Sequence, residues 1–112
     1  MFISRHKFDQ DEFFALQWKR PDGITVLIQP AEEGGYFAKI ISFDRDNVVT
    51  EAETGQELIE MVNEAMYDYL DIPLVYRPRM GLFMPPEKVR EEIKAKIPNK
   101  YLNKEIGLAR VA

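Results

Sequence analysis

The stretch TGQELIEMVNEAMYDYL, residues 54–70, decides the fold that we expect for this chain. Thr54 and Glu57 form a capping box, in which each side chain can satisfy a backbone N–H that the first helical turn leaves free. Apolar residues then recur every three or four positions, which predicts an amphipathic helix over residues 55–70 that ends before Pro73. The apolar stripe of this helix must pack on another apolar surface.

The residues before this helix have the composition of strands joined by tight turns. Residues 24–29 form a β-branched run, residues 36–43 a second, aromatic-led run, and residues 48–52 a short third one. Gly34 and Gly35 between the first two runs can adopt positive φ, so we expect a hairpin there. The fold class predicted is therefore α+β, an antiparallel β-meander of three to four strands with one long amphipathic helix packed on it.

Further elements are expected on both sides of this core. Residues 13–19 are aromatic and precede the turn Arg20-Pro21-Asp22-Gly23, which predicts an extra N-terminal strand. After the helix, residues 79–84 predict a short strand, and Pro85-Pro86-Glu87 opens a second helix. Residues 100–106 could form one more short helix. The core thus carries a short C-terminal strand/helix extension.

Charge is distributed unevenly along the chain. The 112 residues contain 15 Lys+Arg and 19 Asp+Glu, a formal net charge of −4. Residues 1–76 contain 6 basic and 15 acidic residues, which gives −9, whereas residues 77–112 contain 9 and 4, which gives +5. We therefore divide the chain into a core, 1–76, and a basic C-terminal extension, 77–112, which could face nucleic acid or fold back on the acidic part.

Composition excludes several classes of protein. Without cysteine there is no disulfide framework, no thiolate zinc site and no cysteine nucleophile. Apolar runs such as residues 26–28 are far shorter than the roughly 20 residues that span a bilayer. Asp9, Asp11 and Glu12 stand where a signal peptide needs an apolar segment. We expect a cytoplasmic protein with no cofactor and no membrane partner.

Three segments in the first half occur in a recognisable order. They are TVLIQ at 25–29, EEGGYFA at 32–38, and ETGQEL at 53–58, which leads into Ala65 and residues 67–70. With these segments, the stretch from 25 to 70 resembles the HicB-like antitoxin family. The resemblance implies a partial ribonuclease H-like fold without catalytic competence, acting as the antitoxin of a toxin–antitoxin pair. The implied partner is a small basic HicA-type mRNA interferase, whose active site the antitoxin covers.

Many members of this family also repress their own operon through a C-terminal DNA-binding segment. The extension from Arg79 onward, with a strand, a Pro-Pro-Glu helix start and a basic helix, looks like an incomplete ribbon-helix-helix unit. Operator DNA is therefore a second partner that the resemblance implies. A stand-alone DNA- or RNA-binding regulator and an orphan HicB-like interaction module remain open as alternatives.

The charge pattern indicates which residues would contact each partner. An acidic half suits a basic ribonuclease, because it can mimic the phosphate backbone and speed encounter. The residues that we predict to bind this protein partner are Phe43, Asp44, Asp46 and Glu51. The residues that we predict to bind nucleic acid are Arg77, Arg79, Lys88, Arg90 and Lys94. Exposed strand edges favour a homodimer or a higher homo-oligomer in every case.

No catalytic or metal site is expected. Asp44, Asp46, Glu51 and Glu53 could in principle hold metal ions for a ribonuclease H-type reaction, but a turn and a solvated strand edge explain them better. His6 is the single histidine and has no second histidine or cysteine as a partner. We therefore predict that the protein is not an enzyme.

The first half is also rich in aromatic residues, among them Phe14, Trp18 and Phe37. Such residues could stack single-stranded bases if they lay on an exposed sheet. Basic residues are sparse in this acidic half, so core packing or a protein interface is the favoured interpretation.

Overall fold

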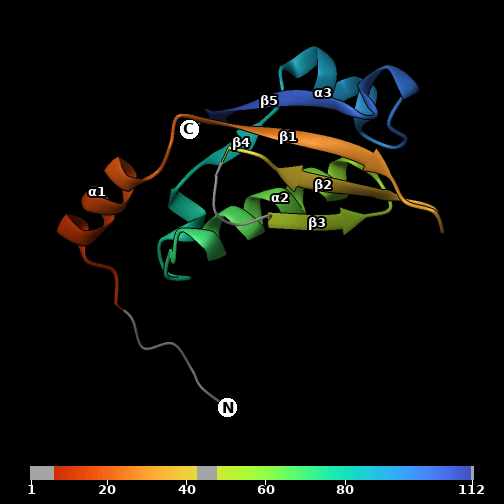
Figure 1. Cartoon of the computed structure of the whole chain (residues 1–112). Helices are drawn as coiled ribbons and strands as arrows, with labels where there is room; N and C mark the ends of the chain where they lie inside the picture. The colour runs from red at the N-terminus through yellow and green to blue at the C-terminus, as the bar shows by residue number, and fades with distance from the viewer. Residues whose placement is uncertain (1–6, 43–47, 112) are drawn as a thin grey trace.

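Five strands form one antiparallel sheet in the order β3-β2-β1-β5-β4 (Figure 1). This computed structural model describes residues 7–42 and 48–111. The strands are β1 (Gly23–Pro30), β2 (Tyr36–Ile40), β3 (Val48–Ala52), β4 (Leu82–Met84) and β5 (Lys104–Val111). The predicted α+β class is confirmed, because the first three strands form a meander and a long helix packs on the sheet.

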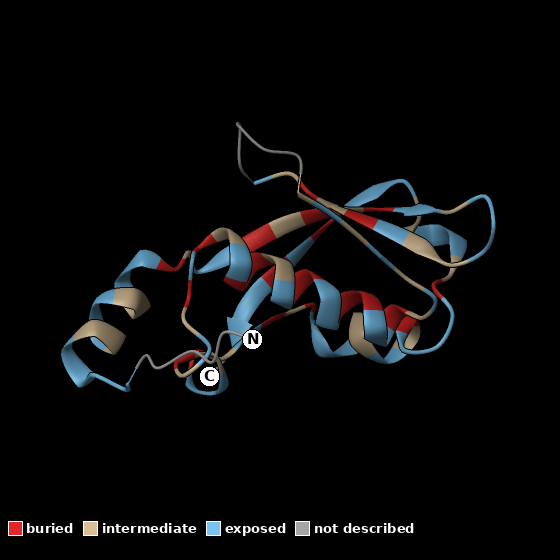
Figure 2. Ribbon diagram, turned by 90° about the horizontal axis from the view of Figure 1, so that it is seen from below, coloured by how far each residue is buried: buried red, intermediate tan, exposed pale blue. Residues whose placement is uncertain are grey.

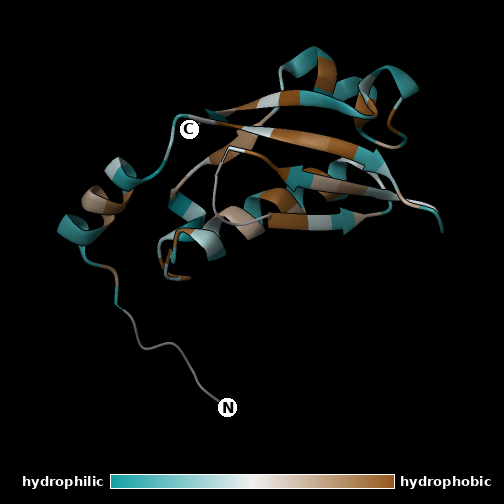
Figure 3. Cartoon of the chain, viewed as in Figure 1, coloured by the Kyte–Doolittle hydropathy of each residue, from teal (hydrophilic) through white to brown (hydrophobic). Residues whose placement is uncertain are grey.

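The hairpin of β1 and β2 has the predicted glycine turn. Gly34 and Gly35 have φ values of 98° and 79°, a conformation that glycine adopts without steric cost. The register pairs Val26 with Ile40, so these two side chains lie on the same face of the sheet. Figure 3 shows the apolar residues of β1 along most of its length. Burial alternates along the strand, as expected when only one face is covered.

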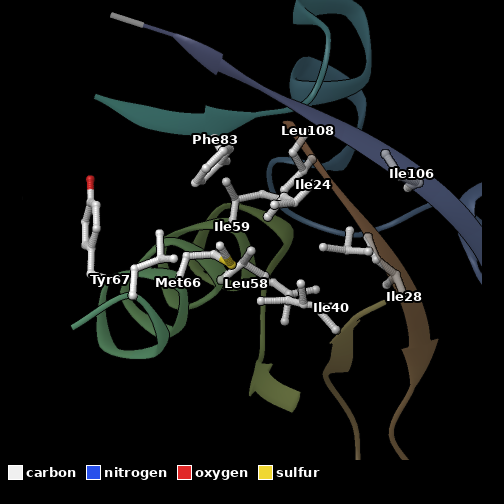
Figure 4. Close-up of a cluster of buried hydrophobic side chains, with 14 of the residues drawn as sticks. Ile24, Ile28, Ile40, Leu58, Ile59, Met66, Tyr67, Phe83, Ile106 and Leu108 are labelled. Atoms are coloured by element: carbon white, nitrogen blue, oxygen red, sulfur yellow. The ribbon is translucent and has the colours of Figure 1, made fainter. Parts of the chain in front are cut away.

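The predicted long helix is present as α2 (Gly55–Tyr69). The hydroxyl of Thr54 accepts a hydrogen bond from the backbone N–H of Glu57 at 3.2 Å, which confirms the Thr54 half of the predicted capping box. Figure 4 shows the apolar side of α2 facing the apolar side of the sheet. The buried side chains that meet there include Leu58, Ile59, Val62 and Met66 from the helix, and Ile24, Val26, Ile28, Ile40, Phe83, Ile106 and Leu108 from the sheet.

The prediction of an N-terminal strand at 13–19 is wrong. These residues belong to the helix α1 (Gln10–Lys19), because the Asp9 side chain accepts hydrogen bonds from the N–H groups of the first turn. The aromatic character that suggested a strand serves packing instead, since Phe13 stacks on Tyr76 with ring centroids 5.9 Å apart. Figures 1 and 2 show α1 at one side of the molecule, with no buried residue along its length.

The C-terminal segment contributes two strands to the same sheet. The short strand and second helix predicted there are present as β4 and α3 (Glu87–Ile93). The prediction of a short helix at 100–106 is wrong, because a 3-10 turn, η2 (Asn99–Tyr101), leads into β5. The two-residue spacing of Ile106 and Leu108 places both side chains in the core, which a strand allows and a helix does not. The strands β1–β3 of residues 1–76 and the strands β4 and β5 of residues 77–112 thus belong to one sheet.

The second face of the sheet carries exposed apolar residues. Phe37, Val49 and Val111 alternate with the covered positions of their strands and are exposed. Within the described residues, no helix is long and apolar enough to cross a membrane.

Candidate functional site

A cleft of about 950 Å³ lies where the β1–β2 turn meets the end of β3 and the start of α2. Its lining includes the glutamates Glu32, Glu33, Glu51, Glu53 and Glu57. No lysine or arginine is among the described residues that line it. We call this hollow the acidic cleft. All its glutamates are exposed, so their charges remain solvated.

Strand register and a close backbone approach build the acidic cleft. Tyr36 pairs with Ala52 and Phe37 with Glu51, which brings the acidic turn beside the end of β3. Gly35 is required for this approach, because a Cβ atom there would lie 2.7 Å from the carbonyl oxygen of Ala52. The hairpin and the third strand thus collect carboxylates that are far apart in sequence.

The carboxylates of the acidic cleft are spread out rather than convergent. Among the described residues, no group of three or more His, Cys, Asp or Glu side chains could hold a metal ion. Phe37 lies in the same cleft, directly opposite Glu51 in the sheet, and its ring is exposed. An apolar ring among dispersed negative charges suits a basic protein surface, because it supplies both charge complementarity and an apolar contact.

The sequence-based site overlaps the acidic cleft only in part. Glu51 lies in the cleft, whereas Phe43, Asp44 and Asp46 fall outside the described residues. The other glutamates of the cleft are not among the residues predicted to bind the protein partner; they are Glu32, Glu33, Glu53 and Glu57. The signal that could have found them is the hairpin itself, since a meander must place its first turn next to the end of its third strand.

The predicted nucleic-acid residues lie on two separate elements. Arg77 and Arg79 belong to the 3-10 turn η1 (Arg77–Arg79), and Lys88, Arg90 and Lys94 belong to α3 or directly follow it. Arg77 already pairs with Asp68 at 3.0 Å, and the Arg79 guanidinium lies over the ring of Phe8 at 4.4 Å. Arg90 donates to the carbonyl oxygen of Pro85 at 3.3 Å. Lys88 and Lys94 are exposed.

The geometry thus shows a negatively charged cleft at one end of the sheet. Comparisons with known proteins add nothing to this description: no family model matches the chain, and no curated protein or solved structure matches it significantly.

Proposed function

We propose that the protein is a non-enzymatic, cytoplasmic antitoxin of the HicB-like kind, which binds and inhibits a small basic HicA-type mRNA interferase. The observation that carries this proposal is the acidic cleft, where Glu32, Glu33, Glu51, Glu53 and Glu57 gather without a lining lysine or arginine. The order β1-β2-β3-α2 agrees with the order that the resemblance implies. Opposite surface charges would accelerate association of the two proteins.

Inhibition would follow from competition with RNA. An interferase that binds RNA presents lysine and arginine side chains to phosphates. Carboxylates of the acidic cleft can accept charge-assisted hydrogen bonds from the same side chains. The exposed Phe37 ring would be the apolar anchor within the charged rim. Occupying the basic surface would prevent the interferase from engaging its substrate.

The test uses the product of the reading frame adjacent to the gene for this chain, where we expect the partner to be encoded. That product should be a small basic protein whose RNA cleavage stops when the two proteins are mixed in equal amounts. The variant Glu33→Gln/Glu51→Gln/Glu53→Gln should inhibit about tenfold less well, because it removes three exposed charge contacts, each worth up to about 1 kcal/mol. Undiminished RNA cleavage, or a neighbour without ribonuclease activity, would refute the proposal.

A matched control removes the same number of charges elsewhere. Glu60, Glu64 and Glu91 are exposed on α2 and α3, away from the acidic cleft. The variant Glu60→Gln/Glu64→Gln/Glu91→Gln should inhibit as the wild type does. Equal loss in both variants would indicate that only the net charge matters and that the acidic cleft is not the binding surface.

A second candidate function is DNA or RNA binding through α3, as in operator repression. It is favoured by Lys88 and Lys94, which are exposed on or next to this helix. Deleting the extension would remove β4 and β5 from the sheet, so point variants are needed. A gel shift by the protein alone that is salt-sensitive and lost in Lys88→Gln/Lys94→Gln would support this function.

A further inference from the structure

A second cleft lies at the other end of β1, where α1 joins the sheet. Its volume is about 640 Å³. It is lined by aromatic residues of α1, among them Phe14 and Trp18, and by Arg20, Asp22 and Arg110. We call it the arginine cleft. Its charge is opposite to that of the acidic cleft.

Arg20 is a buried cation of this cleft whose charge is only partly neutralised. Arg20 is only 6% exposed. Within the described residues, no carboxylate lies within ion-pair distance of its guanidinium group. One terminal nitrogen donates to the carbonyl oxygen of Gly81 at 3.2 Å, and the guanidinium lies over the Phe83 ring at 5.7 Å. Among the described residues, the buried Nε atom has no hydrogen-bond partner. Burial, and then the charge of Arg110, lowers the pKa of Arg20. Asp22 and the Phe83 ring compensate this buried charge only in part, so a further anion close by would stabilise it.

Arg110 adds a second positive charge to this cleft. Its Nη2 atom lies 4.0 Å from the Oδ1 atom of Asp22, and the Asp22 side chain is 98% exposed. This single, solvated carboxylate faces two guanidinium groups, so the cleft keeps a net positive charge. Guanidinium groups bind phosphate oxygens with charge-assisted hydrogen bonds, so a phosphate group is an anion that suits this cleft.

The aromatic wall of the arginine cleft is open to solvent. Trp18 is 79% exposed and Phe14 is 65% exposed, one helical turn apart on α1. Their rings meet edge to face with centroids 6.5 Å apart. Exposed indole and phenyl faces can stack on nucleic-acid bases, and each stacked base contributes about 1–3 kcal/mol. An open aromatic face beside the positive charges of Arg20 and Arg110 fits a ligand that carries both a base and a phosphate.

We propose that the arginine cleft binds a nucleotide, with the phosphate held at Arg110 and the base stacked on Trp18. Arg20 contributes its charge from beneath the cleft, and Arg110 makes the direct contact. A free mononucleotide and the terminal nucleotide of a single-stranded RNA supply the same chemistry. The site is independent of the acidic cleft and of the function proposed for it.

The single tryptophan of the chain, Trp18, reports on this site directly. Titration with 5′-AMP should quench its fluorescence to a plateau, because the adenine ring stacks on the indole. Adenosine, which lacks the phosphate, should bind at least about tenfold more weakly, since a charge-assisted contact is worth about 1.5–3 kcal/mol. Equal affinity for AMP and adenosine, or no saturable quenching by AMP, would overturn the proposal.

Three variants separate a binding role from a structural one. Arg110→Gln should weaken AMP binding about tenfold, whereas Lys96→Gln, which removes a charge from an exposed position outside the cleft, should not change it. Asp22→Asn should tighten binding about twofold to fivefold, because it removes the carboxylate that competes for Arg110. A general loss of structure cannot produce this gain. Unchanged affinity in both Arg110→Gln and Asp22→Asn would refute the site.

A final comparison distinguishes the two sources of the ligand. Hexaadenylate carrying a 5′-phosphate presents the same terminal nucleotide together with further phosphates and bases. Tighter binding of this oligonucleotide than of AMP would assign the cleft to an RNA end. Equal or weaker binding would assign it to free nucleotides.

Discussion

The side chain of Asn63 holds the main chain of Phe83 at the outer edge of β4. Its Nδ2 atom donates to the Phe83 carbonyl oxygen at 2.9 Å, and its Oδ1 atom accepts from the Phe83 N–H at 2.7 Å. The same Nδ2 group also donates to the carbonyl oxygen of Ile59 at 2.9 Å. These are the bonds that a neighbouring strand would otherwise supply, so Asn63 closes this edge of the sheet against further pairing.

Replacing Asn63 should therefore destabilise the protein. Asn63→Ala leaves the buried N–H and carbonyl groups of Phe83 without partners, and we expect a loss of about 2–4 kcal/mol in the free energy of unfolding. Urea unfolding followed by circular dichroism measures this loss. Asn99→Ala, at an exposed position, is the control and should change stability by less than about 0.5 kcal/mol. Similar effects of the two substitutions would contradict the edge-closing role.

A second prediction concerns Gly55, where the start of α2 meets the end of α3. A Cβ atom at Gly55 would lie only 1.7 Å from the carbonyl oxygen of Ile93, so one backbone would have to move. Gly55→Ala should lower stability by about 2 kcal/mol or more, as overpacking does. Gly107→Ala is the control, because a Cβ atom there meets nothing within 4 Å. Thermal unfolding of both variants tests this, and a stable Gly55→Ala protein would contradict the packing described.

The third prediction is a pH dependence that arises from Glu92. The Glu92 carboxylate pairs with Lys100 and accepts a hydrogen bond from the Tyr101 hydroxyl at 2.9 Å, and these contacts lower the pKa of Glu92. A carboxyl group with a lowered pKa stabilises the folded state above its ordinary pKa of about 4.3, and this stabilisation is lost as the pH falls through the lowered value.

Glu92→Gln should accordingly reduce stability at neutral pH and have little effect in acid. The measurement is the free energy of unfolding of both proteins over a range from neutral pH to below the ordinary glutamate pKa. Glu91→Gln, a neighbouring exposed glutamate of α3, is the control. A difference between the wild type and Glu92→Gln that stays constant as the pH falls would show that this carboxylate does not titrate as described.

The fourth prediction concerns self-association at the other edge of the sheet. Within the described residues, β3 pairs only with β2, so its outer edge is open to a second copy. We expect a homodimer in light scattering at micromolar concentration. Val49→Lys should weaken it, because a lysine on an edge strand opposes edge-to-edge pairing. Val111→Lys, another exposed valine on the open face, should leave the dimer intact. A monomeric wild type would refute this prediction.

The local elements could largely be predicted from sequence patterns. The capping pair Thr54 and Glu57 located the start of α2, and the glycine turn at 34–35 located the hairpin. The α1 error has an identifiable cause. Asp9 is an N-cap, and acidic residues follow it in the first turn, which are signals of a helix start, but the aromatic run at 13–19 is typical of a strand.

Long-range placement could not be predicted in the same way. The alternation of Ile106 and Leu108 is a strand signal, but no spacing indicates that this strand pairs with β1 and β4. For the same reason, sequence patterns do not indicate the arginine cleft. Arg20 and Arg110 are at opposite ends of the sequence, and only the pairing of β1 with β5 brings them together.

The position of β5 between β1 and β4 has a kinetic consequence. The hairpin of β1 and β2 closes a short loop, whereas pairing β1 with β5 requires residues near 25 to meet residues near 107. Loop-closure entropy delays such contacts, and folds that depend on them are slow to form. The pairing of β1 with β5 should therefore be the last to form. Until it forms, the apolar strand β1 keeps one edge free to join another nascent chain.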